Sequence, residues 1–162
     1  MMTDEQTVDA IVVGVDGSES SRHALSWAVR HASRTKSQVH AVSVCFVPPI
    51  SPVVTVPLPP IDSDMLDQGN RDALETAIRQ ADPDSHGVTV RTSIVYGEPG
   101  PALCAVAAGA PALIVGSHGH RAFLATLLGS VSSYCVRHAL CPVIVIPPTA
   151  QKHNHDSNSA ES

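Results

Sequence analysis

The sequence of 162 residues is poor in aromatic side chains, poor in charge and free of long apolar runs. Only 3% of its residues are aromatic and 15% are charged, whereas 43% are hydrophobic, so the core is expected to be aliphatic. No apolar run approaches the roughly 18 residues of a membrane span, and the first residues lack the basic and apolar regions of a secretory leader. We therefore expect a cytoplasmic protein that does not enter a membrane.

Paired cysteines and an excess of basic residues are also missing. The four cysteines form no CxxC pair and lie among apolar neighbours, which predicts reduced, buried thiols and no disulfide framework. Acids outnumber Lys and Arg by 15 to 10, giving a formal net charge of -5, which argues against nucleic-acid binding through a basic surface. The length fits one domain of ordinary size.

Acidic residues are absent from residues 99–155, although thirteen of the fifteen acids lie before residue 99. The acid-free stretch holds three bases, whereas the rest of the chain holds seven bases and all fifteen acids. One interpretation is a mostly buried hydrophobic half. The other is a binding site for an anion, which would meet less repulsion there.

The chain alternates short apolar runs with amphipathic segments. Strands are predicted at residues 11–15, 39–47, 88–94, 113–115 and 143–146, with a helix between each pair. This alternation predicts an α/β fold, a single doubly wound sheet of five parallel strands with helices on both faces. We expect a polar leader at residues 1–7, one domain at residues 8–148 and a disordered tail at residues 149–162. Within the domain, residues 48–60 are expected to form a proline-rich loop, whose role is open.

Two predicted strand ends carry sequences that can surround a bound group. Asp16-Gly17-Ser18 follows the first strand, and Gly116-Ser117-His118-Gly119 follows the fourth. In an open parallel sheet, ligands bind beyond such carboxyl ends, where the strand order reverses. Nine residues after Gly119, Gly129-Ser130 opens a predicted helix whose N–H groups and dipole favour phosphate.

Each of these features also has a purely structural interpretation. Asp16 can simply cap the first helix, Ser130 can cap the later one, and the glycines can serve only their turns. His118 and His120 stand two residues apart, but they lack cysteine or carboxylate partners at ligand spacing, so no metal site is predicted.

The spacing Gly116-x-x-Gly119, followed after nine residues by Gly129-Ser130, resembles the universal stress protein family. Residues 13–18 and 137–146 strengthen the resemblance, which covers about residues 8–147. It implies an adenine nucleotide alpha hydrolase-like fold with sheet order 3-2-1-4-5, and membership of the ATP-binding subgroup. The site residues that it implies are Gly14, Asp16, Val44, Val115, Gly116, His118, Gly119, Gly129, Ser130, Val131 and Ser132.

Mg or Mn can accompany ATP through its phosphates. The resemblance further implies that the protein forms a homodimer through strand Val143–Ile146. That segment is a short apolar strand flanked by prolines, and an edge position would otherwise leave its backbone groups unpaired. Asp16 is the only nearby carboxylate that the sequence suggests for a divalent ion.

The sequence offers little for phosphoryl transfer. It has no GxxxxGK[ST] loop, no Lys between Lys36 and Lys152, and no recognisable nucleophile set. We therefore expect a nucleotide-dependent sensor or regulator of the stress response without catalytic residues, and with at most weak ATP hydrolysis. The alternatives are a dimeric interaction protein whose pocket is empty or holds AMP or cyclic AMP, and an ATP-using enzyme of a related α/β superfamily. Its protein partners are not specified by the sequence.

Overall fold

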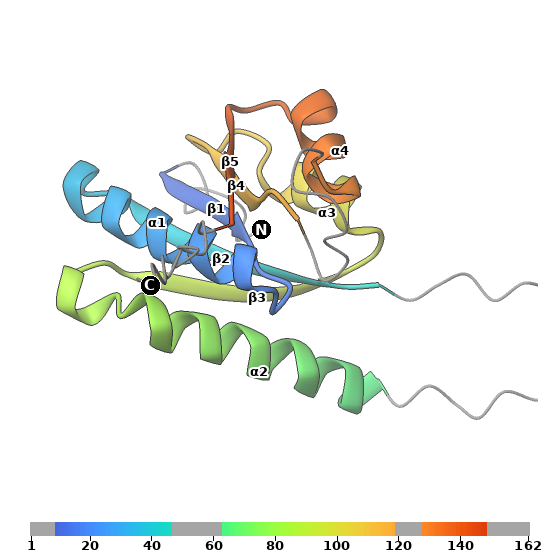
Figure 1. Ribbon diagram of the computed structural model, residues 1–162, viewed down its shortest axis with the longest axis horizontal. Helices are drawn as coiled ribbons and strands as arrows, with labels where there is room; N and C mark the ends of the chain where they lie inside the picture. The colour runs from blue at the N-terminus through green and yellow to red at the C-terminus, as the bar shows by residue number, and fades with distance from the viewer. Residues whose placement is uncertain (1–8, 47–62, 119–127, 149–162) are drawn as a thin grey trace, which may run out of the picture.

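The computed structural model describes residues 9–46, 63–118 and 128–148 (Figure 1). The five predicted strands fall among them, except for residue 47 at the end of the second. The strands form one parallel sheet in the order β3-β2-β1-β4-β5, which confirms the predicted topology. They span Ala10–Gly14 (β1), Gln38–Cys45 (β2), Val90–Tyr96 (β3), Leu113–Gly116 (β4) and Val143–Ile146 (β5).

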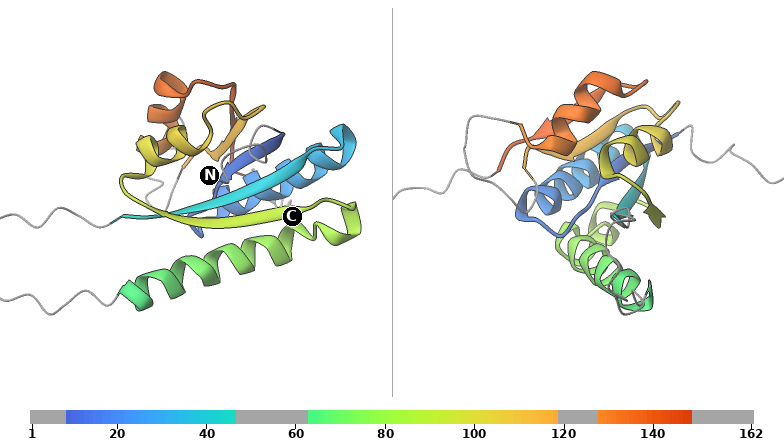
Figure 2. Two further views of the ribbon diagram at one scale, coloured as in Figure 1. Left: turned by 180° about the vertical axis from the view of Figure 1, so that it is seen from behind. Right: turned by 90° about the vertical axis from the view of Figure 1, so that its right-hand side faces the viewer.

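Within the described residues, helices α1 to α4 cover the two faces of this sheet (Figure 2). Residues of α1 and α2 share one apolar cluster with the sheet, and residues of α3 and α4 share the other. The helices span Glu19–Thr35 (α1), Ser63–Ala81 (α2), Pro99–Val106 (α3) and Ser130–His138 (α4). Among the described residues, none of these helices is long and apolar enough to cross a membrane.

The central strand β1 is buried because both of its faces meet helices. Val12 packs into the cluster on the α3/α4 side, whereas Val13 packs into the cluster on the α1/α2 side, and both are fully buried. Small side chains on α1, such as Ala24 and Ala28, are also fully buried against the sheet. The core is therefore aliphatic, as the composition predicts. Because β1 and β4 are neighbouring strands, the loops that follow them lie next to each other.

Two polar contacts hold α2 on the outer strands. The buried hydroxyl of Ser43 in β2 donates a 2.7 Å hydrogen bond to Oδ1 of Asn70, whose amide in turn donates to the carbonyl oxygen of Leu66. The hydroxyl of Tyr96, at the end of β3, donates to Asp67. The sequence pattern indicated an amphipathic α2 but gave no sign of these contacts.

Several predicted boundaries need correction. Strand β2 ends at Cys45 instead of continuing to residue 47, and Phe46 is already unpaired and exposed. Val88 precedes β3, because its N–H donates to Pro83 at the turn that follows α2. The leader, the proline-rich loop, Gly119, His120 and the tail lie outside the described residues.

Candidate functional site

A cavity of about 280 Å³ lies at the carboxyl ends of β1 and β4, where the strand order reverses. Every predicted site residue within the described part of the chain lines it. These are Gly14, Asp16, Val44, Val115, Gly116, His118, Gly129, Ser130, Val131 and Ser132. Gly119 lies outside the described residues, so its position relative to the cavity is not assigned.

Six further residues line the cavity that sequence reasoning did not select, namely Val15, Ser18, Ser21, Val42, Pro99 and Leu103. A signal existed for Val42, because it lies two residues before Val44 on the same face of β2. Pro99 and Leu103 come from the first turns of α3, which the sequence placed after β3 without assigning it to the site.

Two of the lining glycines provide room for neighbouring elements. A Cβ on Gly116 would lie 2.4 Å from the hydroxyl oxygen of Ser20 and 2.8 Å from its backbone carbonyl carbon, so α1 rests directly on the end of β4. A Cβ on Gly14 would lie 2.9 Å from a methyl carbon of Leu103. Both glycines therefore have a packing role that is independent of any ligand.

The turn between β1 and α1 is organised around the carboxylate of Asp16. Oδ1 of Asp16 accepts hydrogen bonds from the backbone N–H of Ser18, at 2.9 Å, and from the Ser18 hydroxyl. Ser18 is the N-cap of α1, and its hydroxyl oxygen accepts from the N–H of Ser21. Asp16 is therefore not itself the N-cap of α1, but it supports the Ser18 cap from two residues upstream.

The same turn needs glycine at one position. Gly17 has φ +83°, a backbone conformation that residues with a Cβ rarely adopt. Its carbonyl oxygen accepts a 2.7 Å hydrogen bond from the guanidinium of Arg22, one turn into α1. These contacts fix the peptide that carries Asp16 into the wall of the cavity.

On the opposite wall, the segment after β4 is tied to the start of α4. The N–H of Gly129 donates a 2.7 Å hydrogen bond to the carbonyl oxygen of Ser117. The buried hydroxyl of Ser132 lies 3.1 Å from that same oxygen and 3.1 Å from the carbonyl oxygen of Gly129. Ser132 thus holds the two segments together, whereas the family resemblance implied that it is a ligand-binding residue.

Gly129 is the N-cap of α4, and Ser130 is its first helical residue. The interpretation of Ser130 as the cap is therefore wrong, because the cap position falls one residue earlier. Gly129 has no side chain to satisfy the first N–H groups of the helix, and such groups have no acceptor within a helix. Together with the helix dipole, they form a site suited to an anion.

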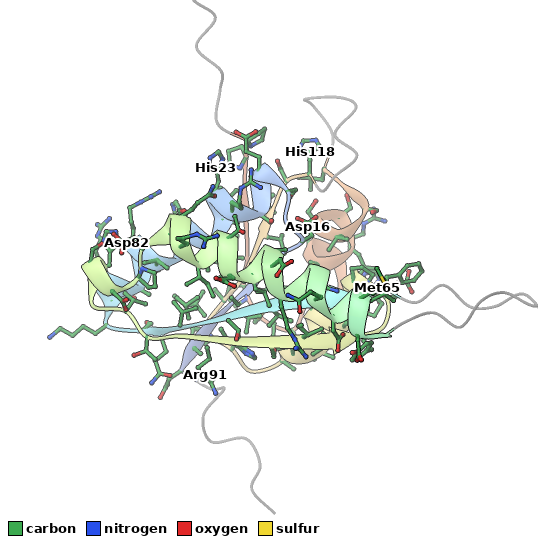
Figure 3. All side chains as sticks on the ribbon, turned by 90° about the horizontal axis from the view of Figure 1, so that it is seen from below. Asp16, His23, Met65, Asp82, Arg91 and His118 are labelled. Atoms are coloured by element: carbon green, nitrogen blue, oxygen red, sulfur yellow. The ribbon has the colours of Figure 1, made fainter. Side chains whose placement is uncertain are left out.

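The polar lining carries little formal charge. Among the described residues that line the cavity, Asp16 is the one carboxylate, and there is no Lys or Arg. His118 extends from the β4 side, where its Nδ1 lies 2.9 Å from the hydroxyl of Ser117. Figure 3 shows Asp16 and His118 on the same side of the molecule. Within the part of the chain that the structure describes, no three His, Cys, Asp or Glu side chains are grouped to hold a metal ion.

One wall of the cavity is apolar. Val42, Val44 and Val115 contribute from the strands, and Leu103 contributes from α3. The cavity therefore combines an aliphatic wall with a helix N-terminus and a carboxylate. Such an arrangement is able to hold a planar apolar group at one end and an anionic group at the other.

Comparison with known protein families gives one match that covers most of the chain. The sequence profile of the universal stress protein family matches residues 7–147. A universal stress protein of Mycobacterium tuberculosis strain H37Rv is 35% identical over 153 residues, which cover 91% of this chain and 48% of that protein. The chain thus spans about half the length of the curated relative.

Two solved structures with similar folds carry the same family name. The universal stress protein UspA from Lactobacillus plantarum has 28% sequence identity and a TM-score of 0.67, with 89% of this chain and 99% of that chain covered. A universal stress protein in complex with cAMP has 26% identity and a TM-score of 0.60, with 85% and 95% covered.

Proposed function

The chain belongs to the universal stress protein family, and from this premise we propose that its cavity binds ATP and that the protein acts as a nucleotide-dependent regulator of a stress response. One observation carries the proposal. Four separate backbone segments, which end β1, β2 and β4 and begin α4, meet at a single cavity that has an aliphatic wall and a helix N-terminus.

The aliphatic wall supports the placement of the adenine ring. Val42 and Val44 lie on one face of β2, and Leu103 extends from α3, so a flat ring can be held between them. Burial of apolar surface favours binding by about 25 cal/mol per Å² before the entropic costs of association are subtracted. These apolar contacts favour a base of the right shape, but they do not distinguish ATP from nucleotides with fewer phosphates.

The N-terminus of α4 supports the placement of the phosphates. The N–H groups of Ser130 and Val131 lie in the first turn, and the hydroxyl of Ser130 is exposed beside them. The absence of any other carboxylate among the described lining residues limits repulsion of the anion to that from Asp16. Residues 99–155 hold no acid, and this agrees with an anion-binding role.

Asp16 supports a divalent ion that accompanies the phosphates. A carboxylate beside a triphosphate is repulsive unless a cation lies between them, and Mg²⁺ and Mn²⁺ favour oxygen ligands from carboxylate and phosphate. In this proposal Asp16 contributes one protein oxygen, and the nucleotide contributes the others. Because the described lining offers only this one carboxylate, the metal ion is expected to bind together with the nucleotide and not without it.

Thermal unfolding with added nucleotides tests the proposal. ATP with MgCl₂ should raise the melting temperature, because a ligand at 100 times its Kd stabilises the folded state by about 2.7 kcal/mol. The same measurement with AMP and cyclic AMP separates selectivity for ATP from general binding of adenine nucleotides. Cyclic AMP is included because a structurally similar universal stress protein was solved in complex with cAMP. No shift with any of the three would reject nucleotide binding.

A matched pair of variants locates the binding site. Val44→Phe places a larger side chain in the cavity and should abolish the shift caused by ATP. Val95→Phe is the control, because Val95 pairs with Val44 in the register of β2 and β3, shares its face of the sheet and does not line the cavity. Equal nucleotide responses in the two variants would place the ligand elsewhere.

The regulatory proposal also includes a homodimer formed through β5. Within the described residues, β5 pairs with β4 alone, and its side chains are only half-buried. Leu140, just before the strand, is 85% exposed, and Val136 in α4 is 52% exposed. A second copy of the chain that covers this edge would bury these side chains.

Sedimentation tests the dimer. Leu140→Glu should shift the protein toward the monomer, whereas Met65→Glu should not, because Met65 lies on α2 at the other side of the sheet and is also largely exposed, at 74%. A wild-type monomer at micromolar concentration would overturn the proposal. Release of phosphate from ATP, measured on the same samples, tests the expected lack of substantial hydrolysis.

A further inference from the structure

Three of the four cysteines gather in one layer of the structure. Cys104 lies in α3, Cys135 lies in α4 and Cys141 precedes β5, and all three pack into the apolar cluster on that face of the sheet. Cys135 is fully buried, whereas Cys104 and Cys141 are partly exposed. Cys45, at the end of β2, is not part of this cluster.

The two helices that carry Cys104 and Cys135 approach each other closely. A Cβ on Gly100 would lie 2.8 Å from the ring of Tyr134, so this aromatic ring of α4 rests on the backbone of α3. Cys104 follows Gly100 by four residues and therefore lies on the same face of α3, while Cys135 directly follows Tyr134. The Cys104 thiol lies close enough to Cys135 to contribute to the raised pKa of the Cys135 thiol.

We propose that Cys104 and Cys135 form a thiol pair that a hydroperoxide oxidises to a disulfide, which joins α3 to α4. The pair is a modification site that the nucleotide-binding proposal does not require. Close packing of α3 on α4 and the shared apolar cluster favour it, because a disulfide needs Cα atoms within about 7 Å of each other.

The chemistry begins at Cys104, the partly exposed member of the pair. Its sulfur, as the thiolate, attacks one oxygen of the hydroperoxide, the O–O bond breaks, and the alcohol or water leaves with a proton. Cys104 is then a sulfenic acid. The sulfur of Cys135 attacks the sulfur of Cys104, the S–S bond forms, the S–O bond breaks, and the hydroxyl leaves as water with the Cys135 proton. The two thiols lose two electrons in total, and the hydroperoxide gains them.

The environment of the other two thiols agrees with this order. Burial, followed by the effect of the neighbouring Cys104, raises the pKa of Cys135 to about 12. Burial also raises the pKa of Cys141. Because the thiolate is the nucleophile toward peroxide, neither is suited to react first at neutral pH.

The disulfide would also act on the proposed nucleotide site. Leu103, beside Cys104, lines the cavity, and α4 begins with the residues that are proposed to bind phosphate. A disulfide between α3 and α4 would therefore fix the part of the cavity wall formed by α3 relative to the part formed by the start of α4. This consequence rests on the proposed function, whereas formation of the disulfide does not.

Peptide mapping tests the pair directly, since trypsin separates all four cysteines. Cleavage after Arg91, Arg121, Arg137 and Lys152 places Cys104, Cys135 and Cys141 on three successive peptides, and Cys45 on a fourth that ends at Arg71. The full-length protein is treated with hydrogen peroxide, alkylated, digested without reductant and analysed by mass spectrometry. The expected product is peptide 92–121 joined to peptide 122–137, with the loss of two free thiols per chain.

Other products would overturn the proposal. These are a link from peptide 92–121 to peptide 138–152, a link between two chains on a non-reducing gel, Cys104 oxidised without a partner, or no reaction. Cys104→Ser should abolish the linked peptide, and it is a mild change at a partly exposed position. Cys45→Ala is the control that should leave the linked peptide unchanged. ATP-induced stabilisation is measured separately before and after oxidation, so a failure of nucleotide binding leaves the mapping result interpretable.

Discussion

The hydroxyl of Ser132, in the first turn of α4, lies 3.1 Å from the carbonyl oxygen of Ser117 and donates a hydrogen bond to it across a separation of 15 residues. Ser117 directly follows β4, so this buried contact sets the distance between the end of the strand and the start of the helix. The width of the proposed phosphate site depends on it.

Ser132→Ala should therefore lower both stability and ligand response. Loss of a buried donor leaves the Ser117 carbonyl with one partner fewer, which costs about 1 kcal/mol. Urea unfolding measures that cost, and the ATP-induced shift measures the effect on the site. Ser130→Ala, at an exposed hydroxyl in the same turn, should leave stability unchanged. If Ser130→Ala is the more destabilising variant, Ser132 is not the residue that holds the start of α4 to Ser117.

Gly116→Ala should destabilise the fold even without nucleotide. Its Cβ would overlap the backbone of Ser20, and overpacking of this kind costs about 1–3 kcal/mol. Urea unfolding of the nucleotide-free protein provides the measurement. An unchanged midpoint would mean that α1 moves away from β4 without cost.

Gly69→Ala should have the opposite effect. Gly69 lies inside α2, and a Cβ there meets nothing within 4 Å. Replacing glycine by alanine within a helix stabilises by up to about 1 kcal/mol. The variant is measured beside Gly116→Ala under the same conditions, and a decrease in its unfolding midpoint would contradict the open surroundings of residue 69.

Ser43→Ala should loosen α2. The change removes the hydroxyl that donates to Asn70 and leaves the amide oxygen of Asn70 without that bond, at a cost of about 1–2 kcal/mol. Hydrogen exchange should show faster exchange of amides in α2 than in α4. Similar acceleration in both helices would indicate a global loss of stability instead.

Stability should fall as the pH drops below about 6.5, in part because of His40. Burial, and to a smaller extent the guanidinium of Arg91, lowers the pKa of His40 in the folded protein. The unfolded chain therefore binds the proton at a higher pH than the folded chain, so protonation favours unfolding as the pH falls through this range. Above the unfolded pKa, His40 contributes no pH dependence.

His40→Gln removes the titration and retains a side chain able to bond to Ser93, which lies 2.8 Å from Nε2 of His40. Melting temperatures of the variant should fall less than those of the wild type between pH 7 and pH 5. Parallel curves would exclude His40 as a source of the slope.

Apolar periodicity and turn residues predicted five parallel strands in one doubly wound sheet, and the family resemblance implied their order, which brings the loops after β1 and β4 together. Local sequence did not reveal contacts made between elements that lie far apart in the chain. Examples are the Ser43–Asn70 bond, the position of Leu103 against Gly14, and the tethering role of Ser132. The family resemblance implied that Ser132 is a site residue, but the direction of its hydroxyl depends on packing that only the folded chain defines.

The contact between Gly116 and Ser20 affects how glycine motifs are used to assign nucleotide binding across sequences. A relative that has lost its ligand would still be under pressure to keep a glycine where α1 rests on β4. Gly129 differs, because its φ of −62° is open to any residue. The loss of Gly129 therefore carries more diagnostic weight than the retention of Gly116 when sequences are sorted into nucleotide binders and non-binders.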